Sequence, residues 1–205
     1  MVLLSSLTES LNPNLEARLK QIIQLGKARL GYIPSQYDRE RFYFEKMKPN
    51  LERIGFREFL YCDIDQEHDE ENKERLHQCD AVFLSGGNTF YFLGNLQKRG
   101  LVSFLTEYVR DGGMLIGVSA GAMVMSTTID VAGIIDPNDV QLEDTRGFDL
   151  VQLHFLPHYS KEVHWDDLEN FSKRHELPVY GCKDDSGIIV EDDRVERFGQ
   201  VVKIG

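Results

Sequence analysis

Short apolar runs alternate along the first half of the chain with longer segments in which apolar residues recur at helical spacing. The apolar runs have the length and composition of buried strands and cover residues 2–4, 28–33, 59–62, 81–84 and 114–116. The segments between them favour helices at about 13–26, 38–54, 69–78, 89–98 and 102–110. This β–α alternation predicts a parallel sheet with helices on both faces. In such sheets, ligands bind at the carboxyl ends of the strands.

Local signals mark the first two helices. Asn12 and Pro13 are typical of an N-cap and a first helical residue, and the helix should end near Gly26. Its apolar residues form one stripe, which consists of Leu15, Leu19, Ile22 and Ile23. Pro49 should kink or split the second helix, because proline lacks the N–H that continues the hydrogen-bond ladder.

The end of the chain has a different pattern. Three short apolar or alternating runs follow one another with few residues between them, at 187–190, 195–198 and 201–204. They predict short antiparallel strands that extend one edge of the sheet. The chain is therefore expected to be α/β, a three-layer αβα arrangement with a mostly parallel sheet and a C-terminal antiparallel edge. With 205 residues and no linker-like stretch, residues 1–205 are expected to form one domain.

Composition narrows the functional classes. The net charge of −11 argues against a nucleic-acid-binding surface, which needs clustered basic residues. The first residues lack the basic flank of a signal peptide, and no apolar run is long enough to cross a membrane. Cys62, Cys79 and Cys182 have no metal-ligand or pairing spacing, so reduced, buried thiols in a cytoplasmic protein are expected. No cofactor or metal is expected.

The chemistry centres on the run Gly117-Val118-Ser119-Ala120-Gly121, between an apolar strand and a stretch of small residues. This G-x-S-x-G pattern is typical of a sharp strand–turn–helix elbow that exposes a serine hydroxyl. The glycines allow the backbone and a substrate to approach closely. The pattern predicts that Ser119 is a nucleophile for acyl transfer.

A serine nucleophile needs a base within hydrogen-bond reach, and histidine is the usual one. His154 and His158 belong to a segment that should be another strand, with His158 just past its apolar part and behind Pro157. The strand-end position favours His158 as the base. His154, His158 and His164 could instead be taken as a metal triplet, but their spacing fits no metal signature.

The base in turn needs a carboxylate that holds its orientation. The acids between serine and histidine leave this choice open; they are Asp130, Asp136, Asp139, Glu143, Asp144 and Asp149.

An oxyanion hole should come from backbone N–H groups. The N–H of Ala120, directly after the nucleophile, is the usual first donor. Gly86 or Gly87, at the end of the neighbouring strand, is the expected second donor, since a residue without Cβ lets an oxygen approach. Asn88 and Thr89 follow and can either contact substrate or cap the next helix.

Three blocks together resemble the peptidase E family, the aspartyl dipeptidases related to cyanophycinases. They are Ser85-Gly86-Gly87-Asn88-Thr89-Phe90, Gly117-Val118-Ser119-Ala120-Gly121-Ala122 and Leu156-Pro157-His158-Tyr159. The resemblance implies a fold like the class I glutamine amidotransferases, which is flavodoxin-like, with serine in place of cysteine at the elbow. It also implies Ser119 as nucleophile, His158 as base and, in the segment after the elbow helix, Asp136 as the orienting acid, with Asp130 and Asp139 as alternatives.

The resemblance further implies a serine peptidase that hydrolyses small peptides, in particular dipeptides with an N-terminal aspartate. Selecting an acidic side chain needs a fixed cation. Arg39 is taken as the substrate-binding candidate together with Asn88 and Thr89, and Arg41 and Arg146 are further candidates. A small peptide is the expected partner, without nucleic acid or membrane, and a homodimer is one option for the assembly.

Two other hypotheses about the function stay open. A serine esterase of the α/β-hydrolase type shares the Ser…Asp…His order, although only 39 positions separate Ser119 from His158. A non-catalytic binding or regulatory protein could use the same amidotransferase-like scaffold, because fold does not decide function.

Overall fold

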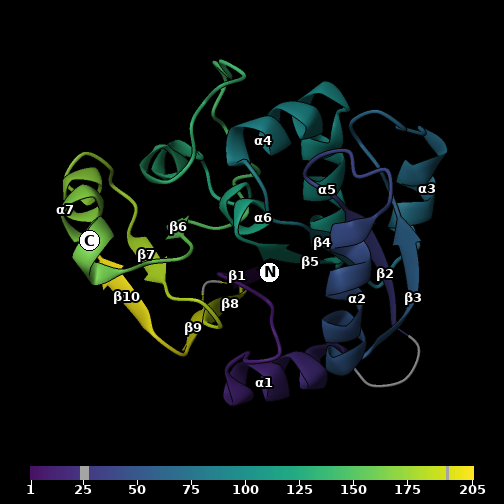
Figure 1. Ribbon diagram of the computed structural model, residues 1–205, viewed down its shortest axis with the longest axis horizontal. Coiled ribbons are helices and arrows are strands. Elements are labelled where there is room, and N and C mark those ends of the chain that lie inside the picture. Colours follow the sequence, from purple (N-terminus) through teal and green to yellow (C-terminus); the bar gives the residue numbers. More distant parts are fainter. Residues whose placement is uncertain (24–27, 193) are drawn as a thin grey trace.

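The computed structural model describes residues 1–23, 28–192 and 194–205, and it confirms the α/β alternation (Figure 1). The helices are α1 (Pro13–Ile23), α2 (Phe42–Ile54), α3 (Glu71–His77), α4 (Thr89–Lys98), α5 (Leu101–Arg110), α6 (Ala120–Met123), the 3-10 helix η1 (Asp130–Ile134) and α7 (Lys161–Ser172). The strands are β1 (Val2–Leu4), β2 (Ala28–Ile33), β3 (Phe56–Tyr61), β4 (Ala81–Leu84), β5 (Met114–Val118), β6 (His154–Leu156), β7 (Val179–Cys182), β8 (Gly187–Glu191), β9 (Arg194–Phe198) and β10 (Val201–Ile204).

The main sheet has seven strands in the order β3-β2-β4-β5-β1-β8-β9. The five strands from β3 to β1 are parallel, whereas β8 is antiparallel to β1 and β9 is antiparallel to β8. This arrangement confirms the mostly parallel sheet. It also confirms that β8 and β9 form an antiparallel edge.

Helices cover both faces of this sheet because its strands alternate their side chains between two cores. In β4, Ala81 and Phe83 pack with α1 and α2, while Val82 and Leu84 pack on the opposite face with α4 and α5. Both sets are buried. The sheet is therefore the middle of three layers.

A second, three-stranded sheet, β10-β7-β6, was not expected. Its strands β6 and β7 are parallel and β10 is antiparallel to β7. Figure 1 shows it beside α7, at the end of the molecule opposite α3 and β3. The prediction that residues 201–204 extend the main sheet is thus wrong, because β10 pairs with β7.

The first helices follow their local signals with one exception. Asn12 caps α1, with its Oδ1 accepting the N–H groups of Asn14 and Leu15 at 3.0 and 3.2 Å. The expected end near Gly26 lies outside the described residues. Pro49 lies inside α2 without splitting it. All three cysteines are free and buried, as expected.

Candidate active site

Ser119 occupies the sharp turn between β5 and α6. Its backbone has φ 52° and ψ −114°, a conformation that non-glycine residues rarely adopt and that is typical of strained functional turns. The turn packs very tightly, since a Cβ on Gly117 would lie 2.2 Å from the carbonyl oxygen of Gly121, and one on Gly121 would lie 2.1 Å from that of Leu84. Both glycines are therefore needed for the elbow to close.

His158 reaches Ser119 from the loop after β6. Its Nε2 lies 3.2 Å from Ser119 Oγ, and its Nδ1 lies 2.6 Å from Oδ1 of Asp184. The His158 backbone has φ 54°, so this residue too is held in the left-handed region. The histidine and aspartate side chains are 47% and 63% exposed, which leaves the line of three groups open to an incoming molecule.

Ser5, directly after β1, forms hydrogen bonds with both His158 and Asp184. Its Oγ accepts the backbone N–H of His158 at 2.7 Å and donates to Oδ1 of Asp184 at 3.3 Å. Ser5 is fully buried, and its own N–H donates to the carbonyl of Ser186 at 3.0 Å. Nothing in the sequence pattern indicated this residue.

Asp136 does not approach His158, and this corrects the acid expected from the resemblance. Its Oδ2 accepts the N–H of Thr89 at 2.9 Å and the hydroxyl of Thr89 at 2.6 Å, at the start of α4. The alternative Asp130 accepts the Thr128 hydroxyl at 3.0 Å, also away from the histidine. The acid therefore does not come from the stretch between Ser119 and His158. Asp184 lies after both, in the turn that leads into β8.

The Gly86–Gly87 turn at the end of β4 faces the elbow. A Cβ on Gly86 would lie 3.4 Å from Cβ of Ser119. Gly87 has φ 151°, and a Cβ there would lie 2.1 Å from Oγ of Ser35, so only glycine fits. Ser35 fixes the turn by donating its hydroxyl to the Gly86 carbonyl at 2.7 Å. Within the described ranges, the N–H groups of Gly87 and Ala120 donate to no acceptor.

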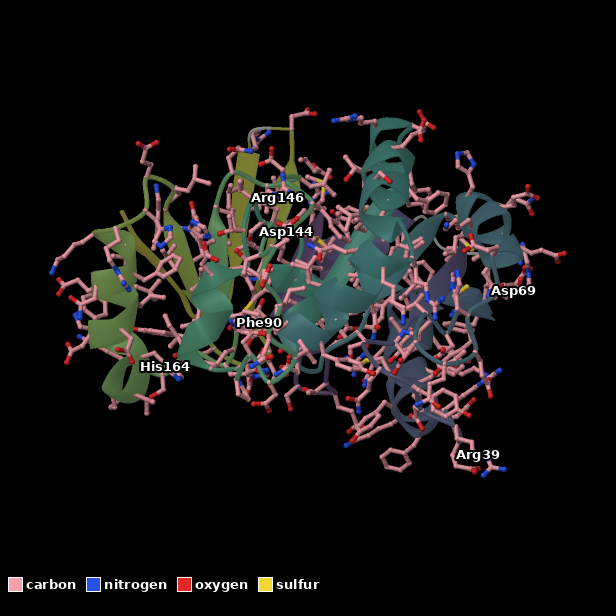
Figure 2. The ribbon with its side chains drawn as sticks, turned by 90° about the horizontal axis from the view of Figure 1, so that it is seen from above. Arg39, Asp69, Phe90, Asp144, Arg146 and His164 are labelled. Atoms are coloured by element: carbon pink, nitrogen blue, oxygen red, sulfur yellow. The ribbon has the colours of Figure 1, made fainter. Side chains whose placement is uncertain are left out.

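The expected substrate-binding residues lie elsewhere. Asn88 caps α4, with its Oδ1 accepting the N–H of Tyr91 at 2.9 Å, and Thr89 is fully buried against Asp136. Of the two expected roles, the geometry favours helix capping for Asn88, and neither residue lines the cavity beside Ser119. Arg39 projects from the periphery of the molecule (Figure 2) and is not among the residues that line the cavity beside Ser119.

The other two arginine candidates, Arg146 and Arg41, interact with other side chains. Arg146 is 81% exposed and pairs with Asp144 at 2.6 Å. Figure 2 labels the two residues next to one another. The guanidinium of Arg41 lies 4.5 Å from the centre of the Tyr61 ring. Neither arginine lines the cavity.

That cavity has a volume of about 680 Å³ and contains Ser119, His158, Gly86 and Gly87 in its wall. Its size is in the range of small-molecule and peptide side-chain sites. The remaining wall comes from β1–α1, β2, α2 and β3, and its charged side chains are Glu9, Asp38 and Lys46.

Two tyrosines in the wall are neutral groups at physiological pH. Burial raises the pKa of Tyr61 to about 12, with a further contribution from Asp63. Burial also raises the pKa of Tyr32 far above its usual range, and its hydrogen bond to Ser85 opposes that effect. The phenol groups therefore add hydroxyl dipoles to the cavity and no charge.

No group of three or more histidine, cysteine, aspartate or glutamate side chains able to hold a metal ion occurs among the described residues. His154 is separated from this site, packed against Phe171 and His175 with ring centres 5.0 and 5.2 Å away. None of the helices in residues 1–23, 28–192 and 194–205 is long and apolar enough to span a bilayer.

Comparison with known protein families shows to which family this chain belongs. The sequence model of peptidase family S51 matches residues 1–198. The chain belongs to peptidase family S51. Its relatives include peptidase E of Streptomyces coelicolor, 28% identical over 186 residues, which cover 84% of this chain and 72% of the relative. An uncharacterized peptidase of Pasteurella multocida is 34% identical over 92 residues, 44% of each chain, so the match spans less than half of that relative.

Solved structures agree with the S51 assignment at the level of the fold. A candidate peptidase E protein of Listeria monocytogenes has a TM-score of 0.74 at 24% identity, covering 99% of this chain and 96% of that one. A peptidase from an acI-B1 actinobacterium has a TM-score of 0.65 at 24% identity. The expected family and fold are thus confirmed, and the chain is a homologue of the serine-type peptidase E proteins.

Proposed function

We propose that this S51 protein hydrolyses small peptides through an acyl-enzyme, with Ser119 as nucleophile, His158 as general base and acid, and Asp184 as the orienting carboxylate. The observation that carries the proposal is the continuous line from Ser119 Oγ to His158 Nε2 (3.2 Å) and from His158 Nδ1 to Asp184 Oδ1 (2.6 Å). A base that is itself oriented by a third group is what a serine needs to become nucleophilic.

In this mechanism Ser119 Oγ bonds to the scissile carbonyl carbon while its proton moves to Nε2 of His158. The C–N bond then breaks, and the leaving amine takes that proton. In the second half, water attacks the ester carbonyl carbon and gives a proton to Nε2. The bond from that carbon to Ser119 Oγ then breaks, Nε2–H returns the proton to Oγ, and the acid leaves. Asp184, which accepts Nδ1–H, keeps Nε2 directed at Ser119 and stabilises the imidazolium in both halves.

The negative oxygen that forms during both attacks needs fixed donors. The N–H groups of Gly87 and Ala120 support this role, since they flank Ser119 and have no acceptor within the described ranges. Gly86 shares the turn, but its carbonyl is fixed by Ser35. We assign the oxyanion hole to Gly87 and Ala120.

The decisive test uses Ser119→Ala and two matched aspartate variants. Peptide hydrolysis and labelling by a fluorophosphonate should both disappear in Ser119→Ala with the fold unchanged. Asp184→Asn should lower kcat by a factor of up to about 10⁴, the loss known for this substitution in a Ser-His-Asp triad. Asp136→Asn, the same change at the residue that caps α4, should lower kcat by less than about tenfold.

Two results would contradict the proposal. Turnover that persists in purified Ser119→Ala would remove the nucleophile. Absence of fluorophosphonate labelling in the wild-type protein would instead favour a binding protein on this scaffold.

A further inference from the structure

The wall of the cavity next to Ser119 is aromatic. Tyr32 of β2, Phe44 of α2 and Tyr61 of β3 all line it. Their ring centres lie 4.9 Å (Tyr32–Phe44), 5.5 Å (Phe44–Tyr61) and 5.8 Å (Tyr32–Tyr61) apart, so the three rings support one another. Leu7 and Met47 extend the apolar surface. Binding an apolar side chain against such a surface is favourable, because it removes apolar area from water.

Strand order fixes where this wall lies relative to the reacting groups. Across the sheet, the order is β3, β2, β4, β5, β1, β8. The aromatic rings belong to the β3–β2 side, the Gly86–Gly87 turn follows β4, and Ser119 follows β5. The anchors of the base lie beyond Ser119, since Ser5 follows β1 and Asp184 precedes β8.

This order separates the two halves of a bound peptide. The leaving amine must lie near Nε2 of His158, because that atom supplies its proton. The residue that supplies the scissile carbonyl then extends the other way, past the Gly86–Gly87 turn. That direction leads to the aromatic part of the cavity.

The charges in the wall oppose an acidic side chain there. Glu9 and Asp38 are two carboxylates against one ammonium, that of Lys46. The Asp38 carboxylate accepts the N–H of Tyr43 at 2.9 Å, which holds it at the start of α2. No arginine is among the described residues that line the cavity. The Arg41 guanidinium lies against the Tyr61 ring, 4.5 Å from its centre, and is not directed into the wall as a bidentate partner for a carboxylate. An aspartate would lose hydration without a matched cation.

We propose that this cavity is a specificity pocket for an apolar or aromatic side chain on the residue that supplies the scissile carbonyl, and that it disfavours aspartate. The inference rests on the proposed acyl-enzyme function. It separates this chain from the aspartyl preference that the family resemblance implies.

Diphenyl phosphonates that differ in one side chain test the pocket directly, because they react with the active serine without needing a leaving peptide. The benzyl (phenylalanine-like) phosphonate should label Ser119 at least tenfold faster than the carboxymethyl (aspartate-like) one. The dipeptides Phe-Ala, Leu-Ala, Met-Ala and Asp-Ala should show the same order in kcat/KM. Differences of this size are usual for side-chain pockets.

A fluorophosphonate control distinguishes the two ways to fail. If it labels Ser119 and the carboxymethyl probe reacts as fast as the benzyl probe, or neither reacts, the pocket assignment is overturned and the nucleophile stands. If the fluorophosphonate itself does not react, the proposed function fails.

Substitutions at Met47 reverse the charge argument. Met47→Arg places a guanidinium in the wall and should raise the aspartate-to-phenylalanine rate ratio at least tenfold. Met47→Gln, of similar length and uncharged, should raise it far less. Arg39→Ala, outside the cavity, should leave the ratio unchanged. The proposal would be overturned if the wild-type protein prefers Asp-Ala and loses its Asp-Ala turnover in Lys46→Ala or Arg39→Ala. Circular dichroism reports whether Met47→Arg folds, and the wild-type series decides if it does not.

Discussion

At the scale of single residues, Ser5 shows how the proposed catalytic pair, His158 and Asp184, is held in place. It is fully buried, and its one hydroxyl, close to the start of the chain, serves two groups from the C-terminal part, the N–H of His158 and the carboxylate of Asp184. The hydrogen bond to His158 spans 153 positions. A buried donor left without its partner costs about 1–3 kcal/mol, so this contact fixes the loop that carries the base.

Ser5→Ala should therefore lower kcat by about tenfold or more with little change in KM. The reason is that the substitution frees the His158 backbone and leaves the cavity beside Ser119 in place. The rate of fluorophosphonate labelling should fall by a similar factor, because that reaction needs the base and no bound peptide. Steady-state kinetics and timed labelling measure the two effects.

Ser126→Ala is the matched control for Ser5→Ala. Ser126 is also fully buried, but its Oγ has no hydrogen-bond partner among the described residues. Its loss should leave kcat and labelling unchanged. A Ser5→Ala protein that is destabilised but labels at the wild-type rate would reduce Ser5 to a purely structural residue.

The residues of the site differ in how far the sequence predicts them. The position of Ser119 follows from a local pattern, because two glycines and a strand determine the elbow on their own. His158 follows from its place at a strand end. Asp184 and Ser5 do not follow, because their partnership arises only when β1 and β8 pair in the sheet. Three-dimensional neighbours of this kind leave no spacing signal in one sequence.

At the scale of elements, Asp136 illustrates a carboxylate whose function is structural. It binds the N–H and the hydroxyl of Thr89 at the first turn of α4, while Asn88 caps the same turn. A negative group at a helix N-terminus also interacts favourably with the helix dipole. The loop 135–138 is thereby attached to α4.

Asp136→Ala should destabilise the protein by about 1–2 kcal/mol, the usual range for a lost helix cap, because Thr89 would keep a buried hydroxyl without its partner. The turnover of the folded enzyme should stay within about threefold of wild type. Urea unfolding and kcat at low temperature measure the two quantities. A loss of kcat as large as that of Asp184→Asn, with stability unchanged, would return Asp136 to the catalytic groups.

The helices and parallel strands are predictable because periodicity and caps are local. The second sheet is not, since β6, β7 and β10 are short and their apolar runs fit either sheet. Which partner β10 takes is decided by where the chain returns after β9. Pro49 shows the opposite limit, because a strong local signal did not end α2 in its packed position.

At the scale of the whole molecule, the second sheet and α7 form a layer of their own beside the main sheet, and the loop after β6 places His158 next to Ser119. His154 starts β6 and is buried between Phe171 and His175. Burial lowers the pKa of His154, the neighbouring His175 lowers it further, and Asp130 and a hydrogen bond involving the Thr128 backbone act in the opposite direction. Its Nδ1 has no partner within the described part of the chain.

This lowered pKa predicts a loss of stability in mild acid. Above about pH 6.5, the usual histidine pKa, His154 is neutral in both the folded and the unfolded chain and the stability is complete. As the pH falls below that value, the unfolded chain binds the proton first, so the free energy of unfolding decreases until the lowered folded pKa is reached. His154→Gln, which cannot titrate, should flatten this part of the curve. Urea unfolding at about pH 8, 6.5 and 5.5 measures it, with His77→Gln, at an exposed position of α3, as a matched histidine substitution outside this region. Equal slopes in wild type and His154→Gln would show that the layer carrying His158 does not sense acid through this residue.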